Sequence, residues 1–328
     1  MAVAELAGVS HQTVSRVING FEGVRPSTKE RVLTAISTLG YRRNNAARTL
    51  VTRRSGLVGV IAVGSFLFGP TRTLAAIEEA ARERGYMTLL ATIRDGATDA
   101  DFSGAVEACL ERDVEALIVI AARESLVRRC ASLSAGLPVV VVGPRPGGAD
   151  RYCTLSVDQE LGARLAVRHL VEHGHRSITI VTGPLDWVDA QDRLRGALAE
   201  CAVQGVTSSV VHGDWTAERG HEVALELTAA GAPTAVFAAN DQLALGLLAG
   251  FRSRGVRVPE DVSVIGFDDV EGAAHYCPPL TTVRQDFASL GHRVLGAALA
   301  LVDGTAPDLA PVPPTLQARG SVTAAGAS

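Results

Sequence analysis

The amino-acid sequence predicts an all-α head followed by a larger α/β part that folds as two doubly wound lobes. Three observations support this division. Two short helical patterns flank Gly8, strand and helix patterns alternate from residue 57 onward, and the charge is unevenly distributed. Residues 1–55 carry nine Arg and Lys side chains against three acidic ones, whereas the remainder carries 22 against 32. A basic head on an acidic body is typical of a protein whose head contacts phosphate.

The first two helices of the head form a helix-turn-helix pattern. Residues 3–7 predict a short helix that ends at Gly8, and Ser10 can cap a second helix with its hydroxyl. Helical spacing turns one apolar face inward, made of Val14, Val17 and Ile18. The opposite face carries polar side chains that can reach base edges, namely His11, Gln12, Ser15 and Arg16. The alternative for this stretch is an ordinary helix pair with a solvated face.

A third helix is expected to close the head. Residues 27–30 (Ser-Thr-Lys-Glu) form a capping-box pattern before an apolar stripe that ends at Gly40 and consists of Val32, Leu33, Ile36 and Leu39. The following run, residues 41–50, is polar and rich in alanine, and it is too short to be a stable helix alone. Only Met1 and Ala2 precede the first helix, so we expect that helix to be poorly capped or the natural start to lie upstream.

Strand and helix patterns alternate through the larger part, which predicts βα units and parallel sheets. The uninterrupted apolar run at 57–63 is typical of a strand buried on both faces. Further strands are expected at 86–92, 115–121, 138–143, 152–157, 177–182, 208–212, 234–239, 262–266 and 315–322. Helices are expected at 71–84, 99–112, 124–135, 158–173, 189–204, 216–230 and 241–254.

Polar residues gather where these strands end. Gly69 to Thr73 follow the first strand, Asp186 to Arg193 and Asn240-Asp241 follow later ones, and Asp268-Asp269 and Trp215 stand at two more. Because ligands of such sheets bind beyond the carboxyl ends of the strands, these residues predict a cleft suited to a sugar. Each residue also has a structural explanation, since Asp241 could cap its helix and Asp269 a turn.

Several classes of protein are disfavoured. The chain has neither an apolar run of 18 residues nor a signal-peptide pattern, so we expect a cytoplasmic protein with no membrane partner. The five scattered cysteines suggest reduced thiols, not a disulfide framework. An enzyme is the least favoured class, because a nucleophile elbow, a Walker loop, a G-x-G-x-x-G motif and a metal cluster are all missing. No cofactor and no metal are expected.

Residues 3–50 resemble the DNA-binding domain of the lactose repressor (LacI/GalR) family. The motif reads VAELAGVSHQTVSRVIN here, followed by a third helix that ends in LGY and a hinge that ends in ARTL. The resemblance implies that His11, Gln12 and Arg16 choose bases in the major groove. It implies phosphate or supporting contacts for Ser10, Thr13, Ser15 and Asn19, and minor-groove contacts from a hinge helix that forms only on DNA, through Asn44, Ala47 and Leu50.

The larger part resembles the effector domain of the same family, which is similar to periplasmic sugar-binding proteins, and it is most similar to the lactose-responsive member. Carrying the family's positions over implies an effector pocket lined by Leu67, Pro70, Thr73, Arg193, Trp215, Asn240, Asp268, Gln285 and Phe287. Two positions depart from that pattern: Gly143 replaces a sugar-contacting Asp, and Asp189 replaces a Ser. We therefore include Asp189 in the pocket and expect that a carboxylate has moved across the cleft.

The expected domains are a helix-turn-helix head at 1–43, a hinge and linker at 44–56, the effector domain at 57–322 and a tail at 323–328. Within the effector domain we assign 57–155 and 285–322 to the first lobe and 156–284 to the second, with crossings near 156, 284 and 315. The C-terminal leucine heptads of the lactose-responsive member are missing here, which implies a homodimer and not a tetramer. The expected function is a repressor that a small sugar, a galactoside or other disaccharide, releases from operator DNA. The alternatives are a corepressor-dependent regulator and a sugar-binding protein with a non-functional head.

Overall fold

The computed structural model describes residues 2–18, 21, 23–40, 54–63, 67–94, 98–120, 123, 137–143 and 153–326. The chain divides between Ser55 and Gly56 into two compact units, each of which is described by itself. The helix expected at 124–135 and residues 44–53 of the expected hinge and linker lie outside the described residues.

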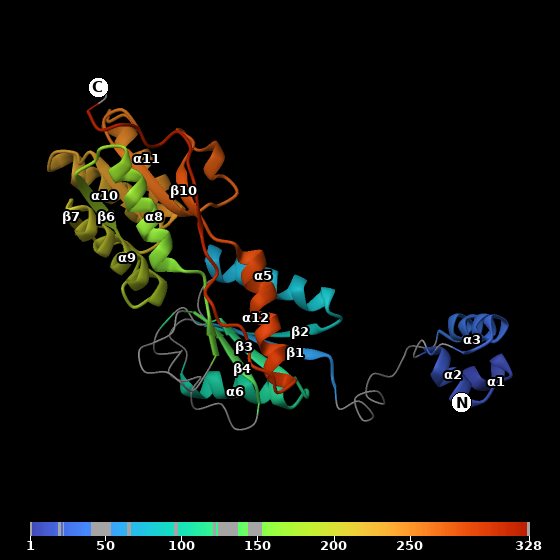
Figure 1. Ribbon diagram of the computed structural model, residues 1–328. Helices are drawn as coiled ribbons and strands as arrows, with labels where there is room; N and C mark the ends of the chain where they lie inside the picture. The colour runs from blue at the N-terminus through green and yellow to red at the C-terminus, as the bar shows by residue number, and fades with distance from the viewer. Residues whose placement is uncertain are drawn as a thin grey trace. The chain divides into compact units, whose positions relative to one another are not determined.

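The first unit is a three-helix head made of α1 (Ala2–Ala7), α2 (His11–Ile18) and α3 (Pro26–Thr38) (Figure 1). Its core consists of small apolar side chains from all three helices, namely Val3, Ala7, Val14, Val17, Val32 and Ala35. Gly8 has a φ of +63° between α1 and α2, a left-handed conformation that glycine adopts without steric cost. The predicted helix-turn-helix is therefore confirmed, with Ile18 packed at the edge of the core.

Two expectations for α3 were wrong. The helix begins at Pro26, Arg25 precedes it without a side-chain cap, and Ser27 lies within the first turn, where it cannot form the expected capping box. Proline suits the first helical position because its fixed φ is helical and its missing N–H would have no partner there. Leu33 and Leu39 are 49% and 44% exposed, because the buried stripe runs through Val32 and Ala35 instead.

The first lobe of the larger unit is a five-stranded parallel sheet in the order β2-β1-β3-β4-β5. The strands are β1 (Leu57–Val63), β2 (Met87–Ile93), β3 (Ala116–Ile120), β4 (Val139–Val142) and β5 (Cys153–Leu155). One face packs on α5 (Phe68–Glu83) and α12 (Phe287–Val302), the other on α6 (Asp99–Leu110). Side chains alternate along β3, so Ile118 faces α5 and α12 while Leu117 and Val119 face α6.

The second lobe is a six-stranded sheet in the order β11-β10-β9-β8-β6-β7, parallel except for the β10–β11 pair. Its strands are β6 (Ser177–Val181), β7 (Thr207–Val211), β8 (Ala235–Ala238), β9 (Ser263–Asp268), β10 (Thr281–Arg284) and β11 (Thr315–Gln317). One face is covered by α8 (Gln159–Glu172) and α9 (Val188–Gln204), the other by α10 (Ala217–Ala229) and α11 (Asp241–Ser253). A short 3-10 helix spans Ala273–His275. The predicted doubly wound lobes are confirmed.

The chain passes between the lobes through three segments: between β5 and α8, between β10 and α12, and before β11. Our assignment of all of 285–322 to the first lobe was wrong, because β11 pairs antiparallel with β10 in the second lobe. Ser321 lies there too, and its hydroxyl donates to the Val264 carbonyl at 2.6 Å. This pairing supplies partners for the backbone groups along the outer edge of β10. The sequence patterns also missed α12, which packs beside α5 in Figure 1.

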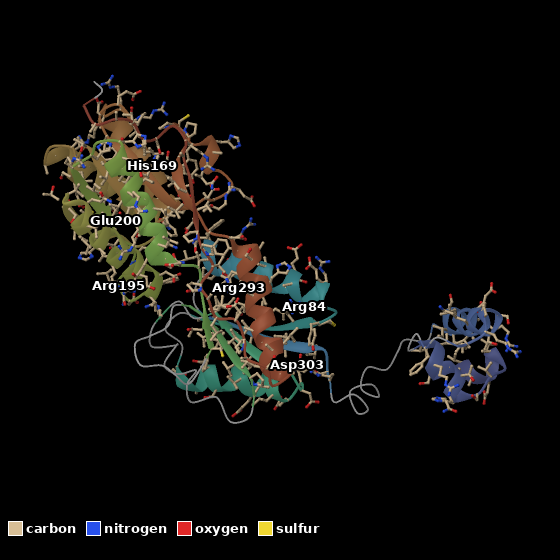
Figure 2. All side chains as sticks on the ribbon, viewed as in Figure 1. Arg84, His169, Arg195, Glu200, Arg293 and Asp303 are labelled. Carbon is tan, nitrogen blue, oxygen red and sulfur yellow. The ribbon has the colours of Figure 1, made fainter. Side chains whose placement is uncertain are left out.

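Ion pairs and close backbone packing join α8 to α9. Glu200 on α9 is buried and accepts a hydrogen bond from Arg168 of α8 at 3.1 Å; Figure 2 marks Glu200 beside α8. A Cβ at Gly196 would lie 2.8 Å from the Glu160 Cα, so only glycine permits the helices to approach this closely. Of the described cysteines, Cys109 and Cys201 are buried, Cys153 is half-buried and Cys277 is exposed, and none of the four forms a disulfide. In the described part of the chain, no helix is both long and apolar enough to cross a bilayer.

We expect Gly196→Ala to lower the free energy of unfolding by about 1–3 kcal/mol, because the added methyl group forces α9 away from α8. Gly104→Ala is the control: Gly104 lies on α6 with no atom near the added Cβ, and the change should raise stability by about 0.5–1 kcal/mol. Urea unfolding of both variants measures the difference. Equal effects of the two substitutions would contradict the close packing of α8 and α9.

Candidate functional site

The exposed face of α2 is the candidate nucleic-acid interface. Val14 and Val17 are turned into the head, whereas Ser10, His11, Gln12, Ser15 and Arg16 are exposed and Thr13 is half-buried. The Thr13 N–H donates to Ser10 Oγ at 3.2 Å, so Ser10 caps α2 as predicted. Polar side chains on the first turns of a second helix are placed to enter a major groove. The other predicted DNA contacts, Asn19, Asn44, Ala47 and Leu50, lie outside the described residues.

The candidate effector site is a cavity between the two lobes of the larger unit. Its volume is about 110 Å³, room for several water molecules and hence for a small hydroxylated ligand. The cavity collects all ten residues expected in the pocket, which are Leu67, Pro70, Thr73, Asp189, Arg193, Trp215, Asn240, Asp268, Gln285 and Phe287. The first lobe supplies the start of α5, and the second supplies α9 and the carboxyl ends of its strands, where such sheets bind ligands.

Four buried side chains form a closed hydrogen-bonded ring in the wall of this cavity, and we call them the polar ring: Arg193, Gln159, Gln285 and Asp268. Arg193 Nε donates to Gln159 Oε1 at 2.8 Å, and Gln159 Nε2 donates to Gln285 Oε1 at 2.9 Å. Gln285 Nε2 donates to Asp268 Oδ1 at 2.7 Å, and Arg193 Nη2 lies 3.2 Å from the same oxygen. Each member is at most 8% exposed, so the ring holds a charged pair out of water with its polar atoms satisfied.

Arg193 is the centre of this arrangement. Besides the ring it donates to the Ala239 carbonyl oxygen. The guanidinium carbon lies 3.8 Å from the centroid of Phe267 and 5.4 Å from that of Trp215, so aromatic faces cover the cation. The planar guanidinium is therefore held in one orientation, which is what recognition of hydroxyl oxygens needs.

The backbone is strained where the strands meet the cavity. Trp215, Asp268 and Asp269 have φ values of 74°, 113° and 53°, in the left-handed region that non-glycine residues rarely occupy. Asp269 is held by two cations, Arg284 at 2.6 Å and Arg319 at 2.6 Å. These ion pairs stabilise the turn that directs Asp268 into the cavity. Asp269 therefore does more than cap a turn, because it also binds two arginine side chains. Residues held in such conformations cluster at ligand sites.

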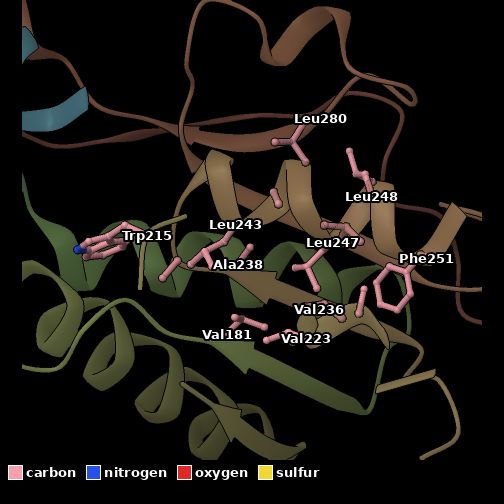
Figure 3. Packing of buried hydrophobic residues seen from close by; sticks show 14 of the residues in the cluster. Val181, Trp215, Val223, Val236, Ala238, Leu243, Leu247, Leu248, Phe251 and Leu280 are labelled. Atoms are coloured by element: carbon pink, nitrogen blue, oxygen red, sulfur yellow. The ribbon is translucent and has the colours of Figure 1, made fainter. Parts of the chain in front are cut away.

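The indole N–H of Trp215 is buried and has no hydrogen-bond partner in the described structure. In Figure 3 the indole nitrogen lies at the end of the ring away from the aliphatic cluster of the second lobe. The ring packs so closely on Gly183 that only a glycine fits there. Because a buried donor without a partner costs free energy, this N–H is a strong indication that a ligand acceptor completes the site.

Gly143 and Asp189, the two departures from the family pattern, both line the cavity. Asp189, on the first turn of α9, makes no hydrogen bond or ion pair within the described part of the chain, so its carboxylate is available to a ligand hydroxyl. Burial raises the pKa of Asp189; the charge of Arg193 opposes this and that of Asp268 adds to it. Burial likewise raises the pKa of Asp268, against the lowering effects of Arg193 and Gln285.

Asp241 does not cap α11. Asn240 does so, accepting from the Leu243 N–H at 2.8 Å and donating to the Trp215 carbonyl at 3.1 Å. Asp241 is fully buried and contacts the Val270 N–H at 2.9 Å and the Thr282 hydroxyl at 2.5 Å. Burial, with the neighbouring Asp268 charge, raises the pKa of Asp241 to about 8. Asp241 thus joins the ends of β9, β10 and α11 behind the cavity.

The sequence patterns missed several cavity residues, of which four contribute aromatic or amide side chains. Phe68 meets Phe287 edge to face at 5.9 Å, and Trp187 meets Trp215 in the same way at 6.0 Å. Gln159 and Gln242 also line the cavity. The position of Trp187 inside the Asp186–Arg193 stretch was a usable signal, whereas a glutamine at the start of a helix carries none. Among the described residues, no group of three or more His, Cys, Asp or Glu side chains could hold a metal ion.

Residues 2–44 match the model of bacterial regulatory proteins of the lacI family, and residues 167–322 match the periplasmic binding protein-like domain. The chain is 34% identical to the lactose operon repressor of Escherichia coli over 93% of this chain and 84% of that one. It is 37% identical to the HTH-type transcriptional regulator CelR of Thermobifida fusca over 92% of this chain and 90% of that one.

Two solved structures resemble the whole chain. The lac repressor dimer bound to operator and the anti-inducer ONPF superimposes with a TM-score of 0.85 at 33% identity, covering 98% of both chains. The complex of the transcriptional regulator CelR with cellobiose superimposes with a TM-score of 0.72 at 32% identity, also covering 98% of both.

We expect Asp241→Asn to flatten the pH dependence of stability. Since the folded pKa is about 8 and the ordinary value is 3.8, the folded protein keeps a proton that the unfolded chain releases, and stability falls as pH rises through this window. Urea unfolding at about pH 5 and about pH 7.5 should give a smaller difference for the variant than for the wild type. Glu107→Gln, an exposed site, is the control; identical slopes in all three proteins would contradict the assignment.

Proposed function

The chain belongs to the LacI family of bacterial regulatory proteins, and on this basis we propose that it is a DNA-binding repressor that a small saccharide releases from its operator. The observation that carries the proposal is the combination, in one cavity, of the satisfied polar ring with the unpaired indole N–H of Trp215. Such a site offers fixed donors and acceptors around aromatic faces, which suits sugar hydroxyls and their C–H surfaces.

On the DNA side, two heads of a homodimer bind successive major grooves of a pseudo-palindromic operator. His11, Gln12 and Arg16 contact base edges. Two properties support this role: the three residues are exposed on α2, and their side chains can form hydrogen bonds with base edges. Phosphate contacts come from the remaining polar residues of this segment, Ser10, Thr13, Ser15 and Asn19. Hinge helices that form on DNA add minor-groove contacts through Asn44, Ala47 and Leu50, with Leu50 as the wedge.

On the effector side, the proposed ligand is a disaccharide, either a galactoside or a relative of cellobiose. Galactosides and cellobiose are both reasonable probes, because one relative is a lactose operon repressor, solved with ONPG, and another was solved with cellobiose. The carboxylate of Asp189 on the second lobe takes the role that the family gives to a first-lobe Asp at the position of Gly143. This exchange predicts that the protein prefers a different saccharide from the one that the lactose repressor binds.

The saccharide acts as an inducer, because closure around it holds the lobes in the orientation that separates the hinge segments. An inducer must bind this state better than the operator-bound state by about 1–3 kcal/mol per site. An operator affinity that rises with saccharide would favour a corepressor-dependent regulator instead. Failure to bind any duplex at low salt would favour a sugar-binding protein whose head does not function.

We expect Arg16→Ala to lower affinity for an operator duplex, selected by the wild type from random DNA, by about 10-fold or more, because a bidentate contact to a base contributes about 1–3 kcal/mol. Affinity for random duplex should fall much less. Arg31→Ala removes the same charge from α3 and is the matched control. Titrations at one salt concentration measure both; an equal loss on operator and random DNA would contradict a base-reading role for Arg16.

We expect Asp189→Asn to weaken saccharide binding by about 10-fold or more, since a sugar hydroxyl would then donate to a neutral amide oxygen in place of the half-buried carboxylate. A thermal-shift screen of lactose, cellobiose and related disaccharides selects the probe, and calorimetry gives the affinities. Asp186→Asn, at an exposed position three residues earlier and before the start of α9, should bind as the wild type does. Unchanged binding by the Asp189 variant, or an equal loss in both, would contradict the exchange of carboxylates.

A further inference from the structure

Gln159 joins the cavity to the segments that connect the lobes. It is the first residue of α8 and lies just after the first crossing of the chain between the lobes. Gln285 lies within the second crossing, between β10 and α12. The hydrogen bond from Gln159 Nε2 to Gln285 Oε1 at 2.9 Å therefore joins two crossings directly. Both residues are buried, with Gln159 4% and Gln285 6% exposed.

The third crossing is held to the first by backbone pairing. The Val312 N–H donates to the Ser156 carbonyl at 2.9 Å, and the Asp158 N–H donates to the Val312 carbonyl at 2.9 Å. A bridge of parallel type thus forms between Val157 and Val312. All three crossings are consequently connected to one another within a few residues of Gln159, so a shift of its side chain acts on the whole connection between the lobes.

The two charged residues set the direction of every hydrogen bond in the polar ring. Arg193 can only donate, so Gln159 must present its carbonyl oxygen to Arg193 and its amide nitrogen to Gln285. Asp268 as a carboxylate can only accept, so Gln285 must present its nitrogen to Asp268. Neither amide can turn over without placing two donors or two acceptors against each other.

We propose that Gln159 is a positioning residue that transmits occupancy of the cavity to the lobe crossings; this inference rests on the proposed saccharide response. A ligand hydroxyl that bonds to Arg193 or Asp268 competes with the ring for the same atoms. Because the hydrogen bonds of the ring can be arranged in only one way, a change at Arg193 or Asp268 alters the Gln159–Gln285 hydrogen bond. The positions of the lobe crossings then change with it. Gln159 itself need not touch the ligand.

The test compares Gln159→Met and Gln159→Glu with the wild type in two measurements at one salt concentration. The first is affinity for lactose or cellobiose, whichever shifts the melting temperature of the wild type. The second is the ratio of operator affinities without and with saturating saccharide. Met removes both hydrogen bonds, whereas Glu keeps the acceptor for Arg193 and loses the donor to Gln285. Gln204→Met, at an exposed position on α9, is the matched control.

We expect both Gln159 variants to reduce the operator-affinity ratio by roughly fivefold or more relative to the wild type, whatever they do to the affinities for saccharide alone and for operator alone. Gln204→Met should leave all three unchanged. If Gln159→Met fails to fold, Gln159→Glu decides. A wild-type ratio in a folded variant that still binds saccharide overturns the inference alone. If neither saccharide binds the wild type, the proposed function is contradicted and the inference falls with it.

Discussion

The buried pair of Arg193 and Asp268 is the constraint on which the candidate effector site depends. A guanidinium and a carboxylate removed from water lose hydration that their mutual attraction alone does not replace, so each needs further hydrogen bonds. Gln159, Gln285 and the Ala239 carbonyl supply them. These partners come from α8, from the end of β8 and from the segment after β10, so satisfying one charged pair requires that all these parts meet in one place.

The parallel architecture makes that meeting possible. Strands β6, β8 and β9 point the same way, and their carboxyl ends deliver polar side chains to one edge of the sheet. Asp241 joins the ends of β9 and β10 from behind, and Asp269 anchors the strained turn beside Asp268. Among the described residues, the indole N–H of Trp215 is one of two buried side-chain polar atoms without a partner, the other being the Thr182 hydroxyl. One part of the cavity wall, the polar ring, thus has all its hydrogen bonds formed, whereas another part, at Trp215, still has a donor without an acceptor.

The sequence carried much of this. Strand and helix periodicity predicted the lobes, and the resemblance to a known family located ten residues that the structure brings to one cavity. Local patterns failed where tertiary contacts decide. Proline moved the start of α3, and α12 was missed although it directly follows β10. The strand expected from residue 315 forms as β11, but it pairs with β10 in the second lobe and not with the first lobe. Gln159 was invisible for the same reason, since its role depends on partners 34 and 126 residues away.

In this account, saccharide binding in the cavity and operator binding by the head are thermodynamically coupled through the lobe crossings. Reciprocity tests it most directly: saccharide affinity is measured on the free protein and on the operator-bound protein, and operator affinity with and without saccharide, at one salt concentration. The account predicts that each ligand weakens the other by the same factor, about 5-fold to 150-fold. Saccharide that binds equally well to free and operator-bound protein would contradict it.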